Sequence, residues 1–353
     1  MSGTDMASTG SSGLLAPDRI LAEVQQYFGS PVRRLTAPGG ASRGSFRAWF
    51  DDRTIIVTQR DTAQLRTNEA LILSALAPYC DDIPRILGQT DNLVFQSDAG
   101  QIRLNHAIHL APLAHREDMA ITALSGILRI QRAARKVDLR DRLPQIWLDR
   151  DALERLVLRA DDLADQIGAP SMTWDRAGTM AVLSVPPLQL VKWDCRAGNA
   201  AIDRHGQLRW FDFEDAGYRH GAEDIAWLVA DEVWPLAADT MTALTRDLLR
   251  PEDTPDKDAY VAYLEQFAVF LAILRLRLII NNANKRGWFP LGDVLKYDKI
   301  GVDPHMAEAL AQRALGLADR HRLTAPLTPL FERAIAVFRA ARGPAPLRRL
   351  DPG

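Results

Sequence analysis

The sequence has few of the features that mark secreted, nucleic-acid-binding or membrane proteins. It contains two cysteines, Cys80 and Cys195, far apart in the chain, so we expect neither a disulfide framework nor a zinc site. The formal net charge of −2 leaves no excess of cations to neutralise nucleic-acid phosphates. The most apolar stretch, residues 267–280, is interrupted by two arginines and is too short to span a bilayer. These absences predict a cytoplasmic protein that binds neither nucleic acid nor membrane.

Several enzyme motifs are also missing. The Gly-rich turn at residues 38–45 is not followed by G-K-[ST], so it is not a Walker A loop. No G-x-S-x-G segment indicates a serine nucleophile. His106, His109 and His115 lie close together, but no carboxylate at a matching spacing accompanies them. We therefore expect no metal site at these histidines.

The composition is that of a globular protein with a sizeable core. The 353 residues are 47% hydrophobic and 25% charged. Short apolar segments bounded by turn residues are frequent in the first part, and helical spacing dominates the rest. This order favours a two-lobed α+β protein over a doubly wound sheet. Helices are expected at residues 18–28, 64–76, 119–134, 143–167, 174–184, 223–234, 241–249, 256–282, 304–319 and 327–341.

The most informative segment is residues 192–214. Asp194 and Asn199 form the pattern D-x-x-x-x-N, and Asp212 ends an apolar strand after a hairpin that turns at residues 203–206. This arrangement is used for phosphoryl transfer from ATP, where the first Asp accepts the proton of the attacking hydroxyl. The Asn and the second Asp hold Mg²⁺ on the phosphates. We therefore predict Asp194 as the catalytic residue, Asn199 and Asp212 as metal ligands, and ATP and Mg²⁺ as cofactors.

The same segment resembles the aminoglycoside phosphotransferase and choline kinase group, the small-molecule branch of the protein-kinase-like fold. The loops of that group read H-G-D-x-x-x-x-N, I-D-[FW]-E and later D-[IL]-A. Here Phe211-Asp212-Phe213-Glu214 and Asp224-Ile225-Ala226 match the second and third patterns. The first pattern departs at Lys192, which stands in place of the usual His.

The resemblance implies a two-lobed protein-kinase-like fold. A small antiparallel β-sheet and a helix would form the nucleotide-binding N-lobe at residues 16–97, followed by a larger, mainly helical C-lobe at residues 98–345. Residues 1–15, rich in Ser, Gly and Thr, would be a disordered N-terminus, and residues 346–353 a tail. Asp224 would lie behind the catalytic loop and anchor its backbone.

A cation on the third strand is expected to hold the phosphates. Residues 54–60 read as that strand, and Arg60 fits the position at which kinases place this cation. Glu69, on the helix that follows, is its candidate partner. A shift of one residue in the strand would put Gln59 at this position instead, and the sequence does not decide between the two.

Two further segments complete the predicted nucleotide site. Gly39, Gly40 and Ser42 lie in the Gly-rich turn between two strands, where backbone N–H groups can approach phosphates closely. Gln96 begins a polar hinge between the lobes, whose backbone would meet the adenine in the fold that the chain resembles.

Because Lys192 departs from the family pattern, the sequence is compatible with more than one class of protein. The leading hypothesis is an ATP-dependent kinase acting on a hydroxyl of a sugar, an amino alcohol or an aminoglycoside-like compound. The alternatives are a nucleotide-binding pseudokinase with a regulatory role and a purely structural or interaction protein. Charged Lys cannot accept a hydrogen bond as His can, but it could pair with Asp224 or reach a phosphate. No acidic patch for a polycationic acceptor is evident, and the sequence predicts no oligomeric state.

Overall fold

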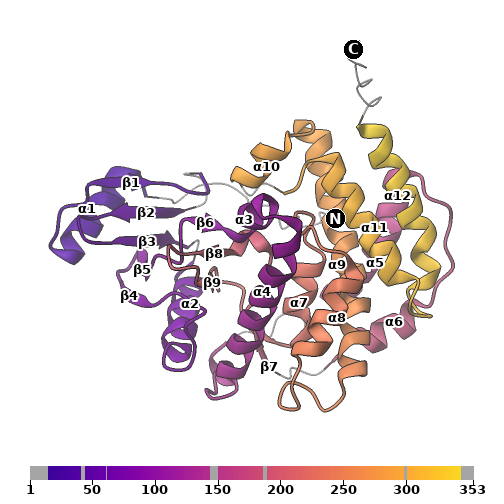
Figure 1. Cartoon of the computed structure of the whole chain (residues 1–353), viewed down its shortest axis with the longest axis horizontal. Helices are drawn as coiled ribbons and strands as arrows, with labels where there is room; N and C mark the ends of the chain where they lie inside the picture. Colours follow the sequence, from indigo (N-terminus) through magenta and orange to yellow (C-terminus); the bar gives the residue numbers. More distant parts are fainter. Residues whose placement is uncertain are drawn as a thin grey trace, which may run out of the picture.

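The computed structural model describes residues 15–40, 44–60, 62–143, 150–185, 189–297 and 300–342. The chain has the expected two-lobed α+β fold, with a small sheet at one end and a helical body at the other (Figure 1). The sheet of the smaller lobe is antiparallel and has the strand order β1-β2-β3-β5-β4. Its elements are α1 (Pro17–Phe28), β1 (Arg34–Thr36), β2 (Ser45–Trp49), β3 (Thr54–Gln59), β4 (Ile86–Gln89) and β5 (Leu93–Ser97).

Helix α1 packs against this sheet and closes a small core. Ile20 and Val24 of α1 are fully buried with Ile55 and Val57, which alternate along β3. The helix ends where Gly29 adopts a φ of 61°, the left-handed conformation that commonly terminates helices. This core fixes which face of β3 points inward. It therefore also fixes the direction in which Arg60, the residue after β3, projects.

Helix α2 (Ala63–Leu76) connects the small lobe to the rest of the molecule. It contacts β4 and β5, and it also contacts α4. Its apolar residues Ile72, Leu73 and Leu76 are fully buried in the large core of the helical lobe rather than in the core under α1. The charged residues of α2 are therefore held at the junction of the two lobes.

Short strands lie between the lobes. β6 (Ile102–Arg103), β8 (Ala200–Ile202) and β9 (Leu208–Trp210) form a three-stranded sheet, and β7 (Gln189–Val191) pairs with β10 (Gly217–Arg219). The predicted hairpin is confirmed, because β8 and β9 are antiparallel and Gly206 turns between them with a φ of 80°. β7 does not pair with β8 but with β10, which follows the hairpin in the chain.

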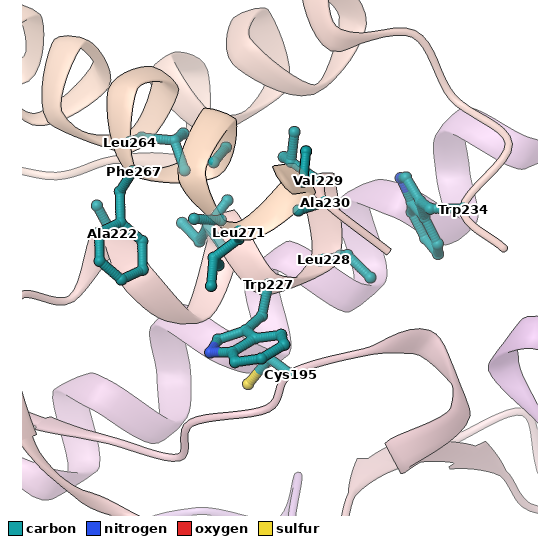
Figure 2. Packing of buried hydrophobic residues seen from close by; sticks show 14 of the residues in the cluster. Cys195, Ala222, Trp227, Leu228, Val229, Ala230, Trp234, Leu264, Phe267 and Leu271 are labelled. Atoms are coloured by element: carbon teal, nitrogen blue, oxygen red, sulfur yellow. The ribbon is translucent and has the colours of Figure 1, made fainter. Parts of the chain in front are cut away.

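The larger lobe packs helices around one extensive apolar core. Figure 2 shows part of it, in which Trp227, Leu228, Phe267 and Leu271 from two helices pack near Cys195 of the central loop. No helix in the described ranges is both long and apolar enough to cross a membrane. The helices are α3 (Leu104–Leu110), α4 (Leu113–Ala134), α5 (Arg150–Ile167), α6 (Arg176–Leu183), α7 (Ala222–Val229), α8 (Ala238–Leu248), α9 (Lys257–Arg286), α10 (Leu291–Tyr297), α11 (Pro304–Ala318) and α12 (Thr328–Ala341).

Several predicted helix boundaries were wrong, among them the start of α4 and the end of α7. The helix expected at residues 119–134 already begins at Leu113, after Pro112, because its exposed polar first turns continue the helix without adding to the apolar pattern. The helix expected at residues 223–234 ends at Val229. The buried Arg313 donates to the carbonyl oxygens of Val229, Asp231 and Trp234, and so satisfies backbone acceptors of the segment in which the helix ends.

Candidate active site

The loop that carries Asp194 is fixed from behind by a buried carboxylate. Asp224, which is 0% exposed, accepts the backbone N–H of Lys192 at 3.0 Å and that of Trp193 at 2.7 Å. Gln131 of α4 donates to the same carboxylate at 2.9 Å. The predicted anchoring of the loop by Asp224 is therefore confirmed, and it requires no contribution from the Lys192 side chain.

A second buried carboxylate, Asp231, holds the other end of the loop. It accepts the N–H of Ala197 at 2.8 Å and that of Val233 at 3.2 Å. Burial and the neighbouring charge of Glu232 raise the pKa of Asp231 to about 7, although nearby arginines oppose the rise. Sequence analysis missed Asp231 because an acidic residue beyond a helix end is common and carries no motif.

The backbone of the site is strained at three positions. Among the described non-glycine residues, positive φ angles occur at Trp193 (62°), Asp194 (45°) and Asp212 (69°). Left-handed conformations of such residues cost on the order of 1–3 kcal/mol each and persist where the surroundings enforce them. The strain falls on both predicted functional aspartates, which the two loops thereby hold in fixed orientations.

The Asp194 carboxylate is engaged by its own loop. Arg196 binds it through both oxygens, with Nε to Oδ1 at 2.7 Å and Nη2 to Oδ2 at 3.1 Å. Asn199 donates its Nδ2 to Oδ2 at 2.8 Å and to the Asp194 carbonyl oxygen at 3.0 Å. Burial alone would raise the pKa of Asp194, but the charge and hydrogen bonds of Arg196 hold it well below its usual range. Arg196 was not among the predicted site residues.

Arg60 brings the smaller lobe into contact with the second loop. Its guanidinium forms a bidentate pair with Glu69 at 2.7 and 2.9 Å, and Nη2 also donates to Asp212 Oδ1 at 2.7 Å. Nη1 lies 3.0 Å from Glu214 Oε2. Glu69 is 0% exposed and also accepts the N–H of Phe213 at 3.2 Å. Three carboxylates from two segments, α2 and the second loop, thus converge on one guanidinium.

The structure decides the register that the sequence left open. Arg60 directly follows β3 and points to Glu69 and Asp212, whereas the side-chain oxygen of Gln59 accepts the N–H of Leu15 at 2.8 Å. Adjacent residues of an extended segment point to opposite faces. Gln59 is therefore committed to the N-terminal segment and Arg60 to the site.

The acidic residues of the second loop, Asp212, Glu214 and Asp215, differ in the direction of their pKa shifts. Burial would raise the pKa of Asp212, but Arg60 and Lys192 lower it below its ordinary value. Burial raises the pKa of Glu214 to about 7, because Arg60 only partly offsets the cost of burial and Asp212 adds repulsion. Burial also raises the pKa of Asp215. Glu214, like Asp231, is thus a carboxyl of the site whose pKa is raised to near neutral pH.

The donor atoms of Asn199 and Asp212 fit a hard divalent cation. The loops are joined by the N–H of Phe211, which donates to the Asn199 carbonyl oxygen at 2.9 Å. Asn199 uses its amide nitrogen on Asp194, so its Oδ1 is the end left for a cation. Mg²⁺ favours oxygen ligands and commonly takes one or two from protein, with phosphates and water completing the shell. No group of three or more His, Cys, Asp or Glu suited to a metal occurs in the described residues.

The predicted nucleotide residues outside this cluster have fewer contacts. Gly40 has a φ of 93°, and open space surrounds the position a Cβ would take, as befits an exposed turn. Gly39 lies in the same turn, whereas Ser42 falls outside the described residues. Gln96 on β5 is 3% exposed, and its Nε2 has no hydrogen-bond partner among the described residues. A buried side-chain amide without a partner is uncommon in folded proteins.

Lys192 is buried in the loop rather than directed toward a ligand. The side chain is 1% exposed, and its Nζ donates to the carbonyl oxygens of Trp193 at 3.3 Å and Asp194 at 3.4 Å. The ammonium also lies 5.4 Å from the centre of the Phe213 ring. Its contact with Asp224 is through the backbone N–H alone, so neither of the roles considered from the sequence describes the side chain.

The fold is shared with solved phosphotransferases of low sequence identity. A GDP complex of an aminoglycoside 2'-phosphotransferase is 13% identical with a TM-score of 0.54, and the match covers 85% of this chain and 98% of that one. A choline/ethanolamine kinase family protein from Mesorhizobium loti is 16% identical with a TM-score of 0.51, covering 92% and 99%. A spectinomycin phosphotransferase with ADP and spectinomycin is 10% identical with a TM-score of 0.52, covering 84% and 99%.

These likenesses extend over both lobes and nearly the whole of each solved chain. No family model and no curated protein sequence matches the chain. At identities this low, the agreement lies in the arrangement of helices and strands and not in the residues. The chain therefore has the two-lobed fold found in aminoglycoside phosphotransferases and in a choline/ethanolamine kinase family protein.

Proposed function

We propose that this protein is an ATP-dependent phosphotransferase that transfers the γ-phosphoryl group to a hydroxyl of a small molecule. The observation that most supports this function is the contact of Arg60 with Asp212 at 2.7 Å, next to the loop of Asp194 and Asn199. A phosphate-binding cation, oxygen ligands for a metal and an acidic group for the hydroxyl are thereby gathered from both lobes.

Each residue then has a defined part in the reaction. Asp194 orients the acceptor hydroxyl and takes its proton as the oxygen bonds to the γ-phosphorus, and the bond to the β-phosphate oxygen breaks to release ADP. Asn199 and Asp212 hold Mg²⁺, which when bound neutralises charge on the phosphates. Arg60 grips the non-transferred phosphates. Most of the rate enhancement comes from positioning and charge stabilisation, because the phosphoryl transition state is loose.

The remaining nucleotide contacts belong to the same proposal. Gly39, Gly40 and Ser42 form the turn that covers the phosphates, and the hinge beginning at Gln96 meets the adenine. The acceptor is a sugar, an amino alcohol or an aminoglycoside-like compound. The setting is cytoplasmic, where ATP is available and the two buried free cysteines stay reduced.

The first experiment measures thermal stabilisation by ATP, with and without Mg²⁺, in the wild type and in Asp212→Asn. A ligand that binds only the folded state raises the melting temperature by mass action. We expect a magnesium-dependent rise in the wild type that Asp212→Asn loses. Asp52→Asn, at an exposed turn, is the matched control and should respond as the wild type does. Absence of a rise at millimolar ATP would refute the proposed nucleotide site.

A nucleotide-binding protein without turnover is the second candidate. The observation that favours it is the bidentate hold of Arg196 on Asp194, together with Lys192 in place of the usual His. The two functions separate once binding is established. ATP consumption with any of a panel of hydroxyl compounds, abolished by Asp194→Asn, supports the kinase, whereas tight MgATP binding with no turnover supports the alternative.

A further inference from the structure

Asp194 and the arginine that holds it are both within reach of an incoming molecule. The Arg196 side chain is 16% exposed and that of Asp194 is 25% exposed. Both carboxylate oxygens of Asp194 accept hydrogen bonds from the guanidinium, at 2.7 and 3.1 Å. Bidentate, charge-assisted pairs of this kind are among the stronger hydrogen-bonded contacts in proteins. A hydroxyl that approaches Asp194 therefore meets a carboxylate that is already engaged at both oxygens.

Arg196 is a separate cation from the one that serves the second loop. Arg60 follows β3 of the smaller lobe and pairs with Asp212. Arg196 instead precedes Ala197, whose N–H is held by Asp231 of the helical lobe. Arg196 thus belongs to the part of its loop that is tied to the helical lobe. An acceptor that binds against this lobe, away from the proposed phosphate contact of Arg60, would meet Arg196.

Separation of the Arg196–Asp194 pair is easiest when each partner receives a replacement. The acceptor hydroxyl replaces Arg196 by donating its hydrogen to the carboxylate. The guanidinium remains largely shielded from solvent, and a shielded cation is most stable beside an anion. A neutral group supplies no charge to it, and an ammonium group repels it. A carboxylate supplies what the guanidinium loses, because its planar fork already binds one in bidentate fashion.

We propose that the acceptor is a hydroxy acid, whose carboxylate replaces Asp194 on the Arg196 guanidinium while its hydroxyl binds Asp194. The inference rests on the proposed function and narrows its acceptors to compounds such as sugar acids. The hydroxyl oxygen bonds to the γ-phosphorus, its proton passes to Asp194, and the bond to the β-phosphate oxygen breaks to release ADP. The carboxylate of the acceptor is unchanged, so Arg196 is a specificity-determining residue that takes no part in the bond changes.

The first test compares acceptors that differ in one charged group. The matched sets are glucuronate, glucose and glucosamine, and glycerate, glycerol and 3-amino-1,2-propanediol. In at least one set, kcat/KM for ATP consumption should be roughly tenfold or more higher with the acid than with either other member. Equal rates, or preference for a neutral or amine member, would overturn this inference and leave the proposed phosphotransferase standing. Absence of turnover with every compound would also overturn it, and the magnesium-dependent stabilisation by ATP then decides separately on the nucleotide site.

The second test removes the charge of Arg196. In Arg196→Gln, kcat/KM for the preferred acid should fall roughly 10–100-fold, as a rise in KM, whereas that for the neutral member of the set should not fall. The affinity for MgATP, measured by thermal melting without acceptor, should stay at the wild-type value. Arg196→Lys keeps a point charge without the fork and should give an intermediate loss. Arg204→Gln, at the exposed turn between β8 and β9, is the matched control.

Two results with the variants would contradict the proposed role of Arg196. An equal loss of kcat/KM with the acid and with the neutral acceptor would show that Arg196 acts on Asp194 and not on the acceptor. A weaker affinity of Arg196→Gln for MgATP would show that the anion it binds is a phosphate of the nucleotide. If Arg196→Gln does not fold, the comparison of acceptors decides by itself, because it uses the wild-type protein alone.

Discussion

The two halves of the candidate site are held in different ways. The Asp194 loop is fixed through its backbone, by the carboxylates of Asp224 and Asp231. The Arg60 half is held mainly through ion pairs of Arg60 to Glu69, Asp212 and Glu214, with one backbone contact, from the N–H of Phe213 to Glu69. Buried backbone hydrogen bonds define one loop conformation, whereas a guanidinium can exchange one anion for another. The comparison indicates a rigid half around Asp194 and an adjustable half around Arg60.

The two arginines of the site also differ in the carboxylates that each one binds. Arg60 is 10% exposed and contacts three carboxylates, so phosphates can replace one partner while the others remain. Arg196 is 16% exposed, and the hydrogen bonds to the Asp194 carboxylate come from it and from Asn199. Release of Asp194 from Arg196 is therefore a step that the proposed reaction requires before the carboxylate can meet a hydroxyl.

Asp194→Asn should have the largest effect on turnover. An amide cannot take the proton of the hydroxyl, so kcat should fall roughly 10²–10⁴-fold, the usual range for loss of an acid–base group. Because the variant keeps a side chain of the same shape, nucleotide-induced thermal stabilisation should persist. Steady-state ATP consumption with an identified acceptor measures the change. Wild-type turnover in this variant would remove Asp194 from the chemistry.

Asp224→Ala tests the rigid half most directly. It leaves the N–H groups of Lys192 and Trp193 without their buried acceptor, and the free energy of unfolding should drop by about 3 kcal/mol. Urea unfolding measures this loss. The exposed Asp52→Asn control should stay within about 0.5 kcal/mol of the wild type. A loss no larger than in the control would show that the loop does not depend on this anchor.

Arg60→Lys tests the adjustable half with the charge retained. Lysine is a point charge and cannot grip Glu69 in a bidentate fashion while reaching Asp212, so ATP affinity should fall roughly tenfold. Titration of ATP in the presence of Mg²⁺ by thermal melting or calorimetry measures the change. Arg53→Lys, on an exposed turn of the same lobe, is the matched control. Equal affinity in Arg60→Lys and in the control would exclude Arg60 from phosphate binding.

Glu214→Gln should have the smallest effect, visible as a change in pH dependence. The pKa of Glu214 is raised by burial from 4.5 to about 7, so the folded state holds a proton that the unfolded state releases. Stability associated with this group is present below pH 4.5 and is lost as pH rises through 7. The wild type should therefore lose stability over this interval relative to Glu214→Gln. Parallel curves of unfolding free energy against pH would contradict the assignment.

Much of the site follows from local sequence patterns. The spacing of Asp194, Asn199 and Asp212 identified the two loops, because a hairpin between them has a short and recognisable signature. The anchoring role of Asp224 followed from the resemblance. The ion pair of Arg60 with Glu69 is also present, on a strand and helix whose periodicity was evident. The roles of these residues in catalysis and nucleotide binding stay predictions.

Other residues of the site could not be found in this way. Arg196 was overlooked because an arginine within a loop is ordinary unless its partner is known, and that partner is set by the turn the loop takes. Asp231 was overlooked because its acceptor role depends on where α7 ends, which Arg313, 82 positions away from Asp231, helps to fix. Contacts between residues so far apart in the chain produce no recognisable local pattern in the sequence.

The sequence by itself determined the two-lobed α+β fold and the pair of acidic loops, because apolar periodicity and motif spacing are local properties of the chain. The tertiary structure alone decided that Arg60 and not Gln59 meets Asp212, and that the Lys192 side chain turns inward against its own loop. Side-chain direction and burial depend on what packs around a residue, and that packing is set by segments far away in the chain.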